Sequence, residues 1–171
     1  MKRHFAISLL LLSILIPVIG QELNQTVFSE KTNSLILIGH CNRDAFAYPE
    51  FQVWFDETYE SYSPKQSVID KISKLDLEQL TISLVMATWC PDSRREVPGF
   101  YRVLDEINFT DGAVTLINVN RNKEVPGEDI AYLNIDFVPT FIIYLDEKEV
   151  GRIIESPEKS LEKDLLKILS H

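Results

Sequence analysis

A cysteine and a serine three residues later, Cys90 and Ser93, are the residues best suited to chemistry in this chain. The segment that holds them reads Thr88-Trp89-Cys90-Pro91-Asp92-Ser93. An apolar, strand-like run ends just before it and helical periodicity begins after it, so we expect Cys90 at the N-terminal end of a helix. Unpaired backbone N–H groups and the helix dipole favour an anion at that position. Because a thiolate is the form that attacks sulfur, the segment predicts cysteine redox chemistry.

Ser93 stands where a second thiol would complete a redox pair. A hydroxyl does not displace sulfur at neutral pH, although it can hydrogen-bond a thiolate. Cys90 would then form a mixed disulfide whose release needs an outside thiol or another cysteine of the chain. The alternatives are that Ser93 is an ordinary helix residue and that Cys90 is an inert buried thiol. The polar residues Asp92, Arg94 and Arg95 favour a reactive, partly exposed site.

Cys41 is the only other cysteine, and it follows a strand candidate that ends at Gly39. Three interpretations stay open: it pairs with Cys90, it bridges two chains, or it is a buried structural thiol. His40 alone is too little to predict a base. Two cysteines are too few for a disulfide framework, and three histidines give no cluster of metal ligands. We therefore predict no metal and no cofactor.

Hydrophobic periodicity predicts alternating strands and helices. Strands are expected at 34–38, 81–87 and 113–119, and helices at 51–59, 67–80 and 92–107. A short helix is expected after Gly127, then strands at 140–145 and 149–154 across a tight turn, and a last helix that begins at Ser156-Pro157. Residues 21–34 are polar and are interpreted as a lead-in. This order predicts an α/β fold with a parallel core extended by an antiparallel hairpin.

Aromatic residues are concentrated between positions 45 and 64. Phe51, Trp54, Phe55 and Tyr59 fall on one face of the expected helix. This face could line a substrate cleft, but packing against the core is the favoured interpretation, because buried aromatic side chains dominate core energetics.

With these residues in place, the chain resembles the thioredoxin-like superfamily over about residues 65–170. The matching features are Trp89-Cys90-Pro91-Asp92-Ser93, Pro98 inside the following helix, Val138-Pro139-Thr140 before an apolar strand, and the final hairpin and helix. The segment from Ala87 to Tyr101 is similar to exported bacterial thioredoxin-like proteins with a tryptophan-cysteine-x-aspartate-serine motif. The resemblance implies a three-layer fold with a central mixed sheet and flanking helices, preceded here by an aromatic-rich N-terminal extension.

The resemblance also implies roles for individual residues. Cys90 would attack a substrate disulfide, with Ser93 in place of the resolving cysteine. Pro139 matches a cis-proline that faces the cysteine, and the backbone of Val138 would pair with an extended substrate, the alternative being an ordinary trans proline. Trp89 and Pro91 complete the expected substrate-binding residues. One departure is Leu84, which stands where thioredoxins have a buried acid.

The N-terminus has the pattern of a secretory signal peptide. Lys2 and Arg3 precede an apolar run from Phe5 to Ile16, and a small residue follows at Gly20. The alternative is an uncleaved membrane anchor, although the run falls short of about 20 apolar residues. The net charge of −9 argues against nucleic-acid binding, and removal of residues 1–20, which hold two cations and no acid, lowers it to −11.

These observations predict a signal peptide at 1–20, an N-terminal extension at 21–64 and a thioredoxin-like domain at 65–171. The expected function is monothiol thiol–disulfide exchange in the periplasm, by removal of mixed disulfides or by isomerisation. Expected partners are protein thiols or disulfides and a low-molecular-weight thiol reductant, with no nucleic acid and no stable membrane insertion after cleavage of the signal. The alternative is a thioredoxin-like binding module for another exported protein. Iron–sulfur ligation is disfavoured, because the motif lacks the Cys-Gly-Phe-Ser sequence of glutaredoxins.

Overall fold

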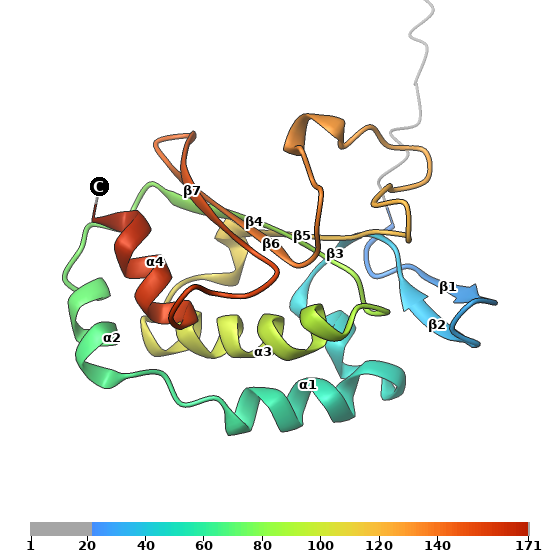
Figure 1. The fold of residues 1–171 in the computed structure, drawn as a ribbon, viewed down its shortest axis with the longest axis horizontal. Coiled ribbons are helices and arrows are strands. Elements are labelled where there is room, and N and C mark those ends of the chain that lie inside the picture. Colours follow the sequence, from blue (N-terminus) through green and yellow to red (C-terminus); the bar gives the residue numbers. More distant parts are fainter. Residues whose placement is uncertain (1–21, 171) are drawn as a thin grey trace, which may run out of the picture.

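The computed structural model describes residues 22–170, and a five-stranded mixed sheet forms its centre (Figure 1). The spatial order is β3 (Gly39–Cys41), β5 (Val114–Asn118), β4 (Leu80–Met86), β6 (Thr140–Leu145) and β7 (Lys148–Ile154). Strands β4 and β5 are parallel, and the other neighbours are antiparallel. The predicted parallel core with an added hairpin is therefore confirmed.

Four α-helices lie together on one side of this sheet (Figure 1). They are α1 (Pro49–Ser61), α2 (Gln66–Ile72), α3 (Pro91–Glu106) and α4 (Leu161–Leu169). Helices α1 and α3 each begin with a proline, whose fixed φ suits the first helical turn and whose missing N–H is not needed there. The aromatic face predicted for α1 packs on the core, because Phe51 and Phe55 are buried.

Alternation along the strands divides the core into two parts. Ile82, Leu84 and Met86 of β4 face the helices and join the larger, helix-side cluster. Val85 and Ala87 point the other way and join a smaller cluster, which we call the loop-side cluster. Its covering layer is the long connection between β5 and β6, which contributes Val125, Ile130, Leu133 and Val138. The sheet is thus sandwiched between helices and a packed loop, which gives the three layers.

The N-terminal segment is part of the same body. Strand β3 pairs with β5, and α1 packs on α3. The Arg43 guanidinium binds both carboxylate oxygens of Asp105 in α3, at 2.8 and 2.6 Å, and Tyr59 of α1 donates a hydrogen bond to the same carboxylate. The segment 21–64 that we interpreted as an extension therefore contributes an edge strand and a helix to the domain core.

Several predicted elements differ from the structure. Part of the expected lead-in forms β1 (Thr26–Ser29), which pairs with β2 (Ser34–Leu37) in a separate hairpin. Helix α2 ends at Ile72, short of the predicted residue 80. The helix expected after Gly127 is a single 3-10 turn, Ala131–Leu133.

The last helix begins at Leu161 rather than at Ser156-Pro157. Glu155 has a positive φ of 58°, which interrupts regular structure directly after β7. The Asp164 carboxylate then accepts the backbone N–H of Glu158, so the preceding turn is closed by a side chain instead of by a helix. Ser160 is extended and serves as the N-cap residue.

The predicted signal peptide lies outside the described residues. Within residues 22–170, no helix has the length and apolar character needed to cross a membrane.

Candidate functional site

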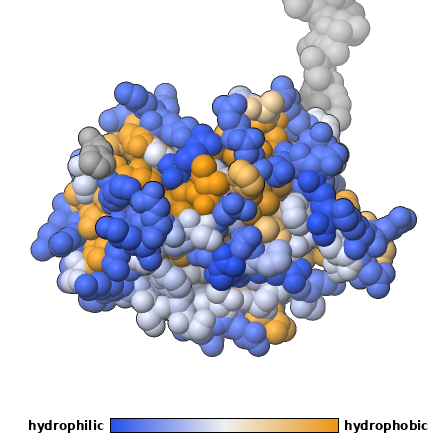
Figure 2. All heavy atoms as spheres, in the orientation of Figure 1, coloured by the Kyte–Doolittle hydropathy of each residue, from blue (hydrophilic) through white to orange (hydrophobic). Residues whose placement is uncertain are grey.

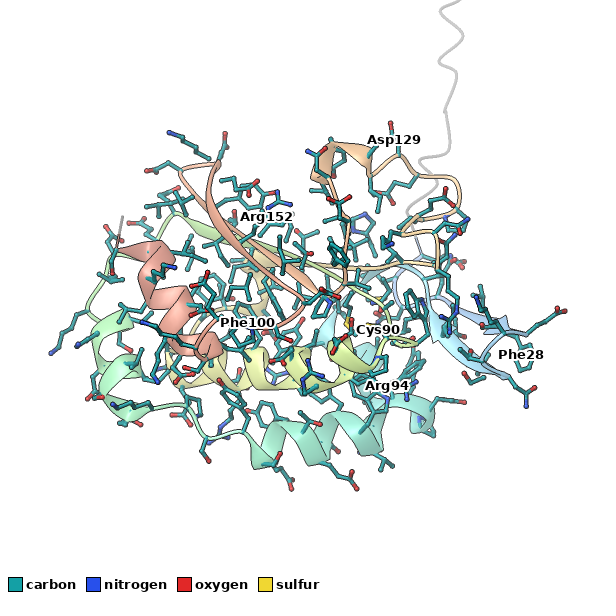
Figure 3. All side chains as sticks on the ribbon, viewed as in Figure 1. Phe28, Cys90, Arg94, Phe100, Asp129 and Arg152 are labelled. Carbon is teal, nitrogen blue, oxygen red and sulfur yellow. The ribbon has the colours of Figure 1, made fainter. Side chains whose placement is uncertain are left out.

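Cys90 is the N-cap residue of α3, as the sequence predicts. Its backbone is extended, with φ −91° and ψ 124°, and its carbonyl accepts the first intrahelical bond from Arg94 N–H at 3.1 Å. Pro91 occupies the first helical position. The sulfur therefore lies at the end of the β4–α3 turn, beside the unpaired N–H groups of the helix start (Figure 3).

The Cys90 sulfur faces the backbone of Val138. The thiol donates a hydrogen bond to the Val138 carbonyl oxygen at an S···O distance of 3.2 Å. The peptide bond between Val138 and Pro139 is cis. Residues 48 positions apart in the sequence thus form one site.

The thiol is less accessible than the sequence suggested. Cys90 is 7 % exposed and packs in the loop-side cluster with Val138 and Ile142. The expectation of a partly exposed thiol is therefore wrong for this conformation. The physical reason is that the β5–β6 connection folds over the turn and covers the sulfur, which polar neighbours in the sequence could not reveal.

Ser93 is fully buried, and its hydroxyl oxygen accepts a hydrogen bond from the backbone N–H of Ala87 at 3.2 Å. This bond closes the turn that carries Cys90. Among the described residues, no hydrogen bond joins Ser93 to the Cys90 sulfur; the sulfur bonds the Val138 carbonyl instead. In this conformation Ser93 positions the backbone of the turn.

The residues before the cysteine are anchored on both sides. The indole N–H of Trp89 donates to the Val119 carbonyl at 3.0 Å, and the Arg121 guanidinium lies 4.6 Å from the centre of its ring. The Thr88 hydroxyl accepts the backbone N–H of Leu37 at 3.1 Å. The turn is therefore connected to the loop after β5 and to the N-terminal hairpin.

Charges within the motif are also arranged by pairing. Asp92 binds Arg95 at 2.7 Å, and Arg95 also binds Glu96 at 2.7 Å, so the two carboxylates share one cation. Arg94 Nε donates to the Thr88 carbonyl, and its guanidinium lies 5.5 Å from the Trp54 ring centre. Figure 3 shows Arg94 close to Cys90 at the start of α3.

Apolar surface borders the Val138–Pro139 bond. Phe137 is 51 % exposed, and Ile154, which pairs with Thr140 in the sheet, is 46 % exposed. Figure 2 shows apolar surface in the hollow between the β6–β7 hairpin and the connection that follows β5. Pro91 is exposed on the motif side. The predicted binding residues are therefore brought together, and Phe137 and Ile154 are additions that the sequence analysis missed.

Cys41 lies on the other side of the sheet from this site. It belongs to β3, pairs with Leu116 and packs in the helix-side cluster, whereas Cys90 packs in the loop-side cluster. Both cysteines are free. Burial raises the pKa of the Cys41 thiol to about 11. These features support the structural interpretation of Cys41 and leave it out of reach as a partner for Cys90 in this conformation.

Position 84 supplies no proton-transferring group. Leu84 is fully buried between Leu116 of β5 and Phe141 of β6. The buried acids that the structure describes, Glu96, Glu162 and Asp164, lie on α3 and α4, and none of them is hydrogen-bonded to Cys90.

A hollow of about 880 Å³ lies under the β5–β6 connection and is lined by residues between 120 and 136. Its lining holds neither cysteine. We place the candidate site at Cys90, whose thiol stands at the start of α3 and faces the cis-proline. Residues 22–170 contain no group of three or more side chains suited to hold a metal ion.

The sheet order β3-β5-β4-β6-β7, with Cys90 at the start of α3 and a cis-proline before β6, decides the fold class. The fold is thioredoxin-like. No protein-family model matches the chain, and no curated protein matches it.

Two of the solved structures with a similar fold come from Pseudomonas aeruginosa and Halobacterium salinarum. A protein of unknown function from Pseudomonas aeruginosa gives a TM-score of 0.55 at 14 % identity, over 78 % of this chain and 91 % of that one. A mutant thioredoxin from Halobacterium salinarum gives a TM-score of 0.36 at 16 % identity, over 63 % and 84 %. At 14 % identity, the similarity to the Pseudomonas aeruginosa protein concerns the fold alone.

Proposed function

We propose that this chain is an exported bacterial thioredoxin-like protein that carries out monothiol thiol–disulfide exchange through Cys90 in the periplasm. The observation that carries the proposal is the Cys90 sulfur at the start of α3, 3.2 Å from the carbonyl of Val138. The Val138 backbone offers a peptide group beside the sulfur that can pair with an extended substrate.

The exchange needs no second thiol in the chain. The Cys90 thiolate attacks one sulfur of a substrate disulfide, a Cys90–substrate disulfide forms, and the other sulfur leaves as a thiolate that takes a proton from solvent. An external low-molecular-weight thiolate then attacks the sulfur bound to Cys90, forms a new disulfide with it and releases Cys90 as a thiolate. The two steps suit removal of mixed disulfides or isomerisation, since Ser93 cannot release the first product.

A binding module is the second candidate, and the low exposure of Cys90 is the observation that favours it. In this alternative the thiol is part of the core, and the apolar surface around Phe137 and Ile154 docks another exported protein. The two candidates differ in whether an external reagent reaches the sulfur.

Alkylation at pH 6 separates these candidates. In Cys41→Ala protein, Cys90 is the only thiol, and its labelling by iodoacetamide is compared with that of free cysteine at the same pH. We expect faster labelling of Cys90, together with a trapped mixed disulfide after exposure to glutathione disulfide. Labelling no faster than free cysteine, with no mixed disulfide, contradicts the exchange function and favours the binding module.

Export is tested on the native protein. We expect the mass of the protein recovered from the periplasm to correspond to a chain that lacks residues 1–20. A full-length chain retained in the membrane contradicts this part of the proposal.

A further inference from the structure

The arginines near Cys90 differ from the other arginines that the structure describes. Six arginines lie within residues 22–170, and four of them bind carboxylates: Arg43, Arg95, Arg102 and Arg152. Among the described residues, neither Arg94 nor Arg121 forms an ion pair with a carboxylate. Both of these arginines are held next to the motif, and they differ from Arg95 because no carboxylate pairs with them in the described part of the chain.

Neutral partners hold both guanidinium groups on the two residues that precede Cys90. Arg94 Nε donates to the carbonyl of Thr88, and Arg121 lies over the ring of Trp89 at 4.6 Å. Trp89 is itself fixed by its bond to Val119. A carbonyl and an aromatic ring orient a cation without neutralising it, so two positive charges stay available on the residues that precede Cys90.

The surrounding charges make this arrangement unusual for the chain. The protein has a net charge of −9, and Asp92, the acid inside the motif, shares Arg95 with Glu96. Asp136, two residues before Val138, is an exposed acid on the opposite border of the site. In and next to the motif, the three cations Arg94, Arg95 and Arg121 therefore exceed the two acids Asp92 and Glu96 by one charge, on an otherwise acidic molecule.

We propose that Arg94 and Arg121 select thiol and disulfide compounds that carry a carboxylate near the reacting sulfur. The inference rests on the proposed exchange at Cys90 and names its substrate class. As the substrate disulfide approaches Cys90, its carboxylate would displace water from one of the two guanidinium groups. The planar N–H groups of the guanidinium match the two oxygens of a carboxylate. The two arginines act here as specificity residues, and the bonds that form and break at sulfur are those given above.

The test compares disulfides of different charge on Cys41→Ala protein. Glutathione disulfide is anionic, hydroxyethyl disulfide is neutral and cystamine is cationic. We expect the rate of mixed-disulfide formation to fall in that order, by about threefold to tenfold per step at low salt, and the differences to shrink as salt screens the charges.

Substitution assigns the preference to the two residues. Arg94→Gln and Arg121→Gln should each lower the rate with glutathione disulfide by about threefold to tenfold, with little change for hydroxyethyl disulfide. Arg102→Gln is the matched control, because it removes the same charge from α3 at a residue paired with Glu106 away from the motif. It should leave the ratio of the two rates unchanged, and thermal unfolding of each variant verifies that it is folded.

A further comparison distinguishes a small anionic thiol from an acidic protein segment as the source of the carboxylate. The rates are measured with glutathione disulfide, with a cystine-linked peptide that has Glu on both sides of the cysteine, and with the same peptide carrying Gln instead of Glu. A preference for the Glu peptide over the Gln peptide indicates acidic protein segments, and a preference limited to glutathione disulfide indicates a small anionic thiol. If disulfides of all charges react at equal rates, or if Arg102→Gln has the same effect as Arg94→Gln and Arg121→Gln, the inference is overturned while the exchange function stands. If no disulfide reacts, the exchange function is overturned as well.

Discussion

At the scale of single residues, the site combines a thiol, a carbonyl and a serine with distinct tasks. Cys90 supplies the sulfur, Val138 supplies the carbonyl that receives its hydrogen bond, and Ser93 holds the turn through Ala87 N–H. Because Cys90 is nearly buried, a substrate reaches the sulfur only if the cover over it shifts. That cover is the β5–β6 connection, which is a loop and therefore the element best able to move.

Replacement of Ser93 by cysteine should convert the site to a dithiol. Position 93 is three residues beyond Cys90, a spacing at which side chains on a helix meet. We expect Ser93→Cys, in a Cys41→Ala background, to oxidise to an internal disulfide, with loss of both free thiols in a thiol titration. Two thiols that persist under oxidising conditions contradict this prediction.

Ser93→Ala is the matched control for that substitution. It leaves the buried N–H of Ala87 without its acceptor, which should lower the free energy of unfolding by about 1–3 kcal/mol. It should form no internal disulfide, so that any new redox behaviour of the cysteine variant is due to its sulfur.

At the scale of elements, α3 carries the reactive residue and is held from several directions. It packs on α1 and α4 as well as on the sheet, and Gly99 marks its closest approach to another segment. A Cβ at position 99 would lie 2.8 Å from the Tyr62 ring and 3.2 Å from Leu161. Tyr62 is itself fixed by a 2.8 Å hydrogen bond from its hydroxyl to Glu162, so the ring has little freedom to withdraw.

Gly99→Ala should therefore destabilise the protein, although alanine is the better helix former by about 1 kcal/mol. We expect the overlap with Tyr62 to lower the free energy of unfolding by about 1–3 kcal/mol, measured by urea denaturation. Gly112→Ala is the control, because its nearest atom is 3.7 Å away, an ordinary contact. A stabilising effect of Gly99→Ala would show that this contact relaxes easily.

At the scale of the whole molecule, the sheet separates the larger core from the candidate site. The helix side holds the larger core and Cys41, and the loop side holds Cys90 under an irregular cover. Such a division allows the cover to rearrange around a substrate while the helices and the sheet stay packed. It also means that the two thiols, although similarly buried, lie in different surroundings on opposite faces of the sheet.

The titration of Cys41 should be visible in the stability of the molecule. Burial raises its pKa from 9.0 in the unfolded chain to about 11 in the folded protein. Below pH 9 both states keep the proton and stability is unaffected. Between pH 9 and 11 the unfolded state loses the proton more readily, so the free energy of unfolding should fall as pH rises.

Comparison with Cys41→Ala isolates this effect. The wild-type protein should lose stability relative to the variant as pH rises from 9 to 11, in parallel urea titrations. The comparison is needed because burial also raises the pKa of Tyr62 and Tyr101, and both tyrosines are present in the two proteins. A constant difference across this pH range contradicts the prediction.

Local patterns in the sequence determined the elements and the position of the sulfur. The apolar run before Cys90 and the helical periodicity after it predicted a cysteine at the start of a helix, and the structure confirms this. The hairpin of β6 and β7 was equally predictable from two apolar runs around a short turn. These features depend on neighbours within a few residues, so periodicity and capping residues are enough to indicate them.

The tertiary structure alone decided what surrounds the sulfur. The burial of Cys90 by Val138, the stacking of Arg121 on Trp89, and the placement of Cys41 on the far side of the sheet all join segments distant in sequence. The β5–β6 connection has little regular structure, so no period in its residues predicts which side chains it buries. Such contacts depend on the order of the strands in the sheet and on the face of the sheet on which each residue lies. Both are determined only when the strands pair.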